Sequence, residues 1–391
     1  MQLNRNHLKP LANLRTFFVF LVCISCFWPA RADQLDDNLQ TVWEVLWDQR
    51  GTPSWLLLWD KSKKVTYSIA GPGAKQNKDH IESAIKAVSD SSGVTFIELE
   101  KNANSQHNEL AMLTIDVGNE KDFEGENSNT PCYAKTLKLS GFRLDKVTVK
   151  MRTSGAWNCA FHEMMHAMGL KGHPSGKTVL SYFKWRRDVL MDLDKLMLLT
   201  AYSDEMPKGA TPLEALVVFS KAVGKQTELG LRSEEIDARI AKFTSTITSD
   251  MEKFAQGQGE VPVIVRRSGR ASETHITTAR LEMAYFLGLA AQRKLIKDDA
   301  QAVVWFRLAS SLDHQPSQVM LARSYYEGRG VAMDKKTAYA WYAKLAALGN
   351  TFGKRQIATL ETELSAEELV LAKAIRIGDA PTSQSIKPQE K

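Results

Sequence analysis

The sequence has 391 residues, of which 43% are hydrophobic and 25% are charged, with 23 glycines and 12 prolines. This composition indicates a globular protein of two or three domains and excludes the disordered, collagen-like and disulfide-scaffold classes. The formal net charge is +6. Residues 1–32 hold four of the 51 Lys and Arg residues and no acid, which leaves 47 basic against 45 acidic residues. With so small an excess, we expect neither nucleic acid nor an anionic membrane as a partner.

The N-terminus has the pattern of a secretory signal. Basic residues precede the apolar run Thr16–Trp28, and Ala30-Arg31-Ala32 offers a cleavage site of small residues. The run is shorter than the roughly 20 residues that span a bilayer, so a retained anchor helix is the less favoured interpretation. We therefore predict a signal peptide over 1–32, cleavage before Asp33, and an exported protein with no membrane span after cleavage.

Strand and helix patterns alternate over residues 33–208. Apolar residues recur at helical spacing from Ile81 to Val88, and this helix is expected to end by Gly93. A second helical pattern runs from Gly155 to Gly169, and Glu120–Pro131 is polar and predicted to be a surface loop. β-rich runs predict strands at Val65–Ile69, Val94–Leu99, Leu110–Val117 and Val147–Met151. The order β-α-β-β-β-α predicts an α+β domain.

Helical patterns dominate the rest of the chain. Thr211-Pro212-Leu213-Glu214 forms a capping box with proline at the first helical position, and it begins a helical extension over 209–249. The Gly-rich Gln256–Gly259 and the basic Arg266–Arg270 predict a linker over 250–276. Residues 380–391 are mostly polar and are expected to be a disordered tail.

An internal repeat lies within residues 277–379. Ala302-x-x-Trp305-Phe306 recurs 36 residues later as Ala338-x-x-Trp341-Tyr342, and both tryptophans are expected to pack in the core. The second unit, Leu321–Gly349, resembles a Sel1-like repeat, which is a relative of the tetratricopeptide repeat. The resemblance implies an all-α solenoid of helix pairs that binds a protein partner. Together with the signal peptide, it suggests the periplasm or the exterior of a Gram-negative bacterium.

Two cysteines remain after the predicted cleavage, Cys132 and Cys159. In an oxidising compartment, a single pair is expected to form a disulfide. Metal ligation by Cys159, three residues before a histidine, is the alternative, although hydrolytic zinc sites seldom use thiolates.

One motif points to chemistry: His162-Glu163-Met164-Met165-His166, within a helical pattern. Histidines four residues apart share one face of a helix, so both can bind one ion. Glu163 can then accept a proton from the attacking water and pass it to the leaving amine. The motif predicts hydrolysis assisted by one Zn²⁺ per chain.

The residues that follow, His166-Ala167-Met168-Gly169-Leu170-Lys171-Gly172-His173, resemble the metzincin zinc metallopeptidases. The resemblance implies that Gly169 ends the helix and that His162, His166 and His173 are the zinc ligands. His173 stands one residue later than in that family, so Asp188, or less favourably Asp192, is the alternative third ligand.

Thr178–Tyr182 is similar to the methionine turn of the same family, with Leu180 in the methionine position. By this resemblance, Tyr182 is expected to assist the substrate carbonyl.

The sequence thus predicts a metzincin-like peptidase domain over 33–208, followed by Sel1-like repeats. Its predicted function is zinc-dependent hydrolysis of a protein or peptide, with Glu163 and Tyr182 as the catalytic residues. The alternative is an interaction protein that acts through its repeats and whose metzincin-like domain is inactive. A third possibility is cleavage of a cell-wall peptide.

Overall fold

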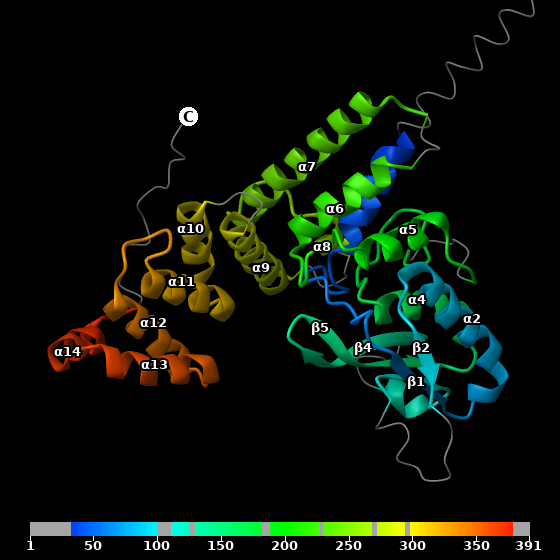
Figure 1. Cartoon of the computed structure of the whole chain (residues 1–391), viewed down its shortest axis with the longest axis horizontal. Helices are drawn as coiled ribbons and strands as arrows, with labels where there is room; N and C mark the ends of the chain where they lie inside the picture. The colour runs from blue at the N-terminus through cyan, green and yellow to red at the C-terminus, as the bar shows by residue number, and fades with distance from the viewer. Residues whose placement is uncertain are drawn as a thin grey trace, which may run out of the picture.

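The computed structural model describes residues 33–99, 111–124, 130–181, 188–226, 230–267, 272–293 and 298–377. The predicted signal peptide and the polar tail lie outside these residues. The described residues form a mixed α/β part that continues into a series of helices (Figure 1). None of the helices in these segments combines the length and the apolar character that crossing a bilayer requires.

The centre of the α/β part is a five-stranded sheet with the strand order β2-β1-β3-β5-β4. β1 pairs in parallel with β2 and β3, and β3 pairs in parallel with β5. The edge strand β4 runs antiparallel to β5. The strands are β1 (Val65–Ala70), β2 (Phe96–Glu98), β3 (Leu113–Val117), β4 (Cys132–Ser140) and β5 (Arg143–Met151).

The sequence did not predict β4, and it predicted β5 four residues too short. None of the β4 side chains is buried, and Leu137 and Leu139 are exposed. An edge strand with both faces open lacks the alternation of buried and exposed residues on which strand prediction relies. The other predicted strands are present within a few residues of their expected bounds.

Two predicted helices cover the sheet. α2 (Ala74–Ser92) buries the apolar positions from Ile81 to Val88 and ends at Gly93, whose φ is +76°. α4 (Ala156–Ala167) packs against α2 and contacts β4 and β5, and α2 also packs against α5 (Asp192–Ala201). Both predicted helices are present, but the predicted order β-α-β-β-β-α lacks the strand β4.

Further helices flank this core. Residues 33–45 are helical, which the sequence analysis did not predict. α6 (Pro212–Gly224) begins at the predicted capping box, in which the Thr211 N–H donates to Glu214 Oε2 over 2.9 Å. α7 (Ser233–Ala255) and α8 (Val263–Arg267) follow. Much of the interval expected to be a linker is thus helical, and Ile264 and Val265 of α8 are buried.

The C-terminal region is a series of helices, which are α9 (Glu273–Gln292), α10 (Asp299–Ser310), α11 (Gln315–Glu327), α12 (Lys335–Ala347), α13 (Thr351–Glu363) and α14 (Ala366–Ala374). Each of α9 to α12 packs on the next one, and α14 packs on α12. In the predicted repeats, Trp305 is 3% exposed, whereas Trp341 is partly buried between two apolar clusters. Gly330 has a φ of +72°, and a Cβ there would overlap the Asp299 carbonyl, so glycine permits adjacent helix pairs to approach closely.

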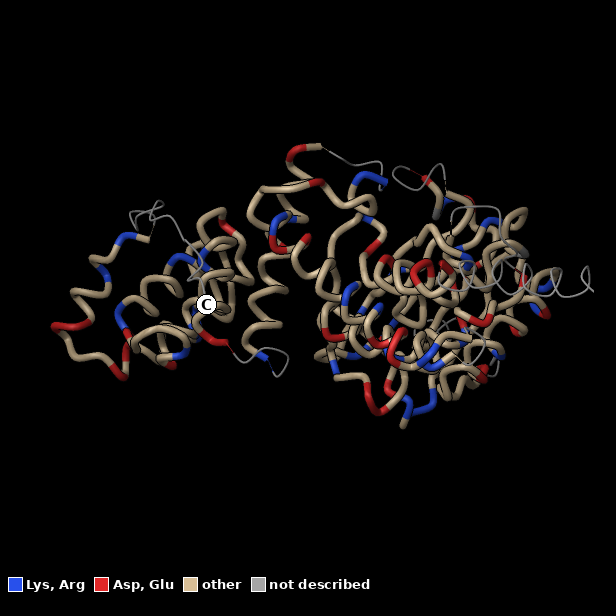
Figure 2. The backbone as a smooth tube through the Cα atoms, turned by 90° about the horizontal axis from the view of Figure 1, so that it is seen from above, with Lys and Arg blue, Asp and Glu red and all other residues tan. Residues whose placement is uncertain are grey.

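An aromatic contact joins this helical region to the α/β part. The ring of Trp55 lies 4.9 Å from that of Phe142 and 5.2 Å from that of Phe286 on α9, between ring centroids. The guanidinium of Arg293, at the end of α9, lies over Trp55 and also bonds to Glu214. Seen from above, the helices of the C-terminal region extend to one side of the α/β part, and basic and acidic residues are interspersed along the chain (Figure 2).

Candidate metal centre

The site is built on α4, which carries His162, Glu163 and His166. The carbonyls at its C-terminal end have partners from elsewhere in the chain. Trp59 Nε1 donates to Ala167 O over 2.9 Å, and the Tyr202 hydroxyl donates to Met168 O over 2.9 Å. Because these buried donors satisfy carbonyls that the helix itself leaves open, the end of α4 is held in one position.

Gly169 turns the chain immediately after the helix, as predicted. Its φ is +97°, and a Cβ at this position would overlap the Leu57 carbonyl. The turn brings the carbonyl of Leu170 to Nδ1 of His166, at 2.7 Å. The residue that ends the helix therefore also helps to orient one of its histidines.

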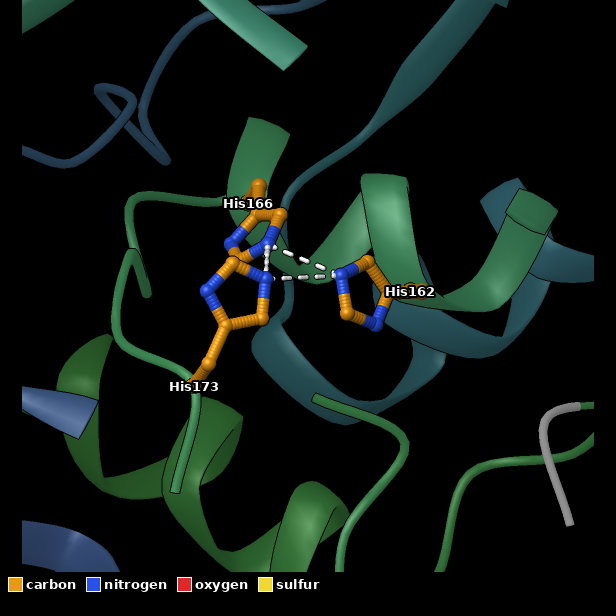
Figure 3. Close-up of side chains that lie close together, drawn as sticks. All are labelled: His162, His166 and His173. Carbon is orange, nitrogen blue, oxygen red and sulfur yellow. Dashed lines mark hydrogen bonds between the residues drawn. The ribbon is translucent and has the colours of Figure 1, made fainter. Parts of the chain in front are cut away.

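The three predicted zinc-binding histidines lie together (Figure 3). The Nε2 atoms of His162, His166 and His173 are 3.1 Å apart in each of the three pairs. All three residues are buried, with at most 7% of their surface exposed. Two come from successive turns of α4 and the third from the loop beyond Gly169.

Hydrogen bonds fix the protonation of two of the rings. His162 Nδ1 lies 2.8 Å from Val179 O, and a carbonyl can only accept, so Nδ1 carries the proton. The same reasoning applies to His166 and Leu170 O. In a neutral ring of this form, Nε2 carries a lone pair. Burial lowers the pKa of His166 to about 4, which keeps its imidazole neutral at pH 7.

This donor set fits a divalent ion such as zinc. Two Nε2 lone pairs facing each other at 3.1 Å cannot hydrogen-bond to one another, whereas a cation between them would satisfy both. A tetrahedral zinc ion about 2.0–2.1 Å from each nitrogen separates its ligands by about 3.3 Å, close to the observed spacing. The Nδ1–carbonyl bonds are the outer contacts that orient metal-binding imidazoles.

The alternative third ligands do not join the cluster. Asp188 is exposed, and the side chain of Asp192 is 94% exposed and pairs with Lys195. In the described part of the chain, the potential metal-ligand cluster consists of the three histidines. Cys159 forms a disulfide with Cys132, as predicted, and so does not present a thiolate. The disulfide links β4 to α4.

Of the two predicted catalytic residues, the structure describes one. Glu163 is 2% exposed, and its Oε1 lies 4.0 Å from Nε2 of His162. Tyr182 lies outside the described residues. Leu180, at the predicted methionine position, is fully buried in a turn closed by the Ser181 N–H and the Thr178 carbonyl, at 3.1 Å.

Asp194 supports the site and was missed by the sequence analysis. It is buried on α5 and accepts hydrogen bonds from the Thr178 hydroxyl and from the N–H groups of Val179 and Met191. Burial raises its pKa to about 6. Since Val179 O holds His162, Asp194 acts on the imidazole through the backbone. The sequence signal was an acidic residue at the third position of a helix.

Comparisons with known proteins assign no family. No family model matches the sequence, and no curated protein matches it. Among solved structures, the chain is similar to a protective antigen of uropathogenic Escherichia coli that displays an SLR fold, at 21% identity and a TM-score of 0.24. The match covers 48% of each chain, so this chain spans about half the length of that protein. A likeness at this TM-score does not assign a fold.

Proposed function

We propose that the protein is an exported zinc-dependent metallopeptidase with a C-terminal module for protein interaction. The observation that carries the proposal is the convergence of three buried imidazole Nε2 atoms, each 3.1 Å from the other two. Such an arrangement is unfavourable unless a cation occupies its centre. The neighbouring buried glutamate adds the acid–base group that hydrolysis requires.

The proposed roles follow from the positions of the side chains. His162, His166 and His173 would hold Zn²⁺. When bound, the ion would act as a Lewis acid and lower the pKa of a coordinated water to about 7. Glu163 would hold the proton of the attacking water on its carboxylate and then deliver it to the leaving amine. Val179 O and Leu170 O keep the two helix imidazoles in the Nδ1–H form. Tyr182 is proposed to donate a hydrogen bond to the oxyanion of the substrate.

Replacing the proposed base tests this reaction. Glu163→Gln preserves the size of the side chain but cannot accept the proton, so we expect peptide hydrolysis to fall by at least about 100-fold. Zinc content should stay near one ion per chain, which serves as the internal control. Full hydrolysis by the variant would contradict the mechanism.

A second function, protein binding without catalysis, is favoured by the exposed apolar residues of the helical region. Met333 is 63% exposed, Leu348 54% and Val370 69%. Zinc-loaded protein that cleaves nothing in a diverse peptide library would support this alternative.

Cleavage restricted to isolated cell-wall material would instead identify a cell-wall peptide as the substrate.

A further inference from the structure

The helix at residues 33–45 holds a buried carboxylate, that of Glu44. The residue is 3% exposed, and a buried charge is unfavourable unless it is paired and hydrogen-bonded. Its Oε2 accepts from the Ser175 N–H at 2.6 Å and from the Ser175 hydroxyl at 3.0 Å. Arg267 of α8 pairs with the same oxygen at 3.2 Å, and Gln40 donates to Oε1. One side chain thus joins three distant segments.

Ser175 is two residues beyond His173, in the loop that supplies the third imidazole. The same loop docks on the helix at two further points. Gly172 N donates to Val45 O over 3.1 Å, and a Cβ at Gly172 would overlap the Glu44 carbonyl. A Cβ at Gly176 would overlap the hydroxyl of Thr41. The loop is therefore fixed on both sides of His173, with Glu44 bonded between these two contacts.

This contact explains how the imidazole of His173, which comes from a loop, can lie in a fixed position beside the two imidazoles of α4. α4 fixes His162 and His166 one turn apart, but the position of His173 depends on what its loop rests upon. Pro174 restricts the backbone of His173 to extended conformations, and the bonds to Glu44 and Val45 place that segment against residues 41–45.

We propose that Glu44 is a positioning residue for the metal centre: through Ser175 it sets the place of His173 and hence the affinity and geometry of metal binding. This inference rests on the proposed function, because it requires a metal at the three histidines. It makes the helix at 33–45 and the Arg267 segment parts of the site, although neither supplies a ligand.

The test compares Glu44→Gln with a matched variant in the full mature chain. Glu214 also accepts from a backbone N–H, that of Thr211, and pairs with an arginine, Arg293, so Glu214→Gln removes a similar charge elsewhere. Zinc dissociation constants come from competition with a chelator of known affinity. The visible spectrum of the Co²⁺-substituted protein reports the ligand geometry.

We expect Glu44→Gln to weaken zinc binding about 10-fold, the scale of changes in outer contacts of metal ligands, and to alter the Co²⁺ spectrum. Glu214→Gln should leave the zinc dissociation constant and the Co²⁺ spectrum unchanged, even if it lowers thermal stability. Ser175→Ala, which retains the backbone N–H, provides a milder variant if Glu44→Gln does not fold, and it should weaken zinc binding at least twofold.

The outcomes separate the inference from the proposed function. The inference alone would be overturned if Glu44→Gln bound zinc with an affinity within twofold of the wild type and had an unchanged Co²⁺ spectrum. If only Ser175→Ala folds, the same two results in that variant would overturn it. Failure of the wild-type protein to bind zinc would overturn both.

Discussion

His166 is held neutral by its surroundings. Burial lowers its pKa from about 6.5 to about 4. Since the unfolded chain then binds the proton more tightly than the folded metal-free protein, acidification from pH 6.5 to 4 destabilises the fold. The shift corresponds to about 3 kcal/mol.

This effect can be measured against a variant that lacks the imidazole. We expect the free energy of unfolding of the chelator-treated wild type to fall by up to about 3 kcal/mol relative to His166→Asn as the pH drops from 7 to 4. Denaturant titrations at several pH values measure this difference. A difference that stays constant with pH would contradict the proposed environment of His166.

Sequence spacing predicted the three histidines that lie together but not the residues that support them. His162 and His166 follow from the helical period, and Gly169 from the need for a positive φ where the helix ends. Glu44 and Asp194 act over long sequence separations, through contacts with Ser175 and Val179 that only the folded chain creates. A local pattern contains no information about such contacts.

At the scale of elements, the Cys132–Cys159 bond fastens the edge strand β4 to α4. Removing it in a Cys132→Ser, Cys159→Ser double variant opens a loop whose ends are 27 positions apart in the sequence. We expect a loss of about 3 kcal/mol in the free energy of unfolding, measured in urea. Reduced wild type should match the variant, and an unchanged urea midpoint would show that the bond does not stabilise the fold.

Most elements with a buried face were predictable, whereas the exposed strand β4 was not. α2 and α4 carry apolar residues at helical spacing, so the sequence places both within a few residues. The solvated edge strand β4 has no such signal. The helix at 33–45 is an exception, because the sequence did not predict it although its C-terminal half is buried.

At the scale of the whole molecule, Trp55 joins the α/β part to the helical region. Its ring lies against Phe286 and under Arg293. Trp55→Ala should therefore weaken the packing of α9 and α10 against the α/β part. We expect faster amide hydrogen exchange in α9 and α10 with little change in α4. Leu360→Ala is the control, because Leu360 packs in an apolar cluster of α11–α14 that contains no residue of α9 or α10. If Trp55→Ala increased amide exchange equally in α4 and in α9 and α10, the result would contradict a contact that acts only between the two regions.

The division into regions was predicted only in part. Gly-rich and basic runs indicated a linker over 250–276, but Ile264 and Val265 are buried and anchor α8. Glycine lowers helical propensity locally, but the tertiary burial of a few apolar residues outweighs that preference in α8. The repeat helices, with their fixed 36-residue spacing, were the more reliable signal.

A crystal structure of the zinc-loaded protein, with anomalous data at the zinc edge, tests the central claim most directly. We predict a single peak about 2.0–2.1 Å from the Nε2 atoms of His162, His166 and His173. A crystal without a peak at these atoms, or with zinc bound elsewhere on the chain, would contradict the account.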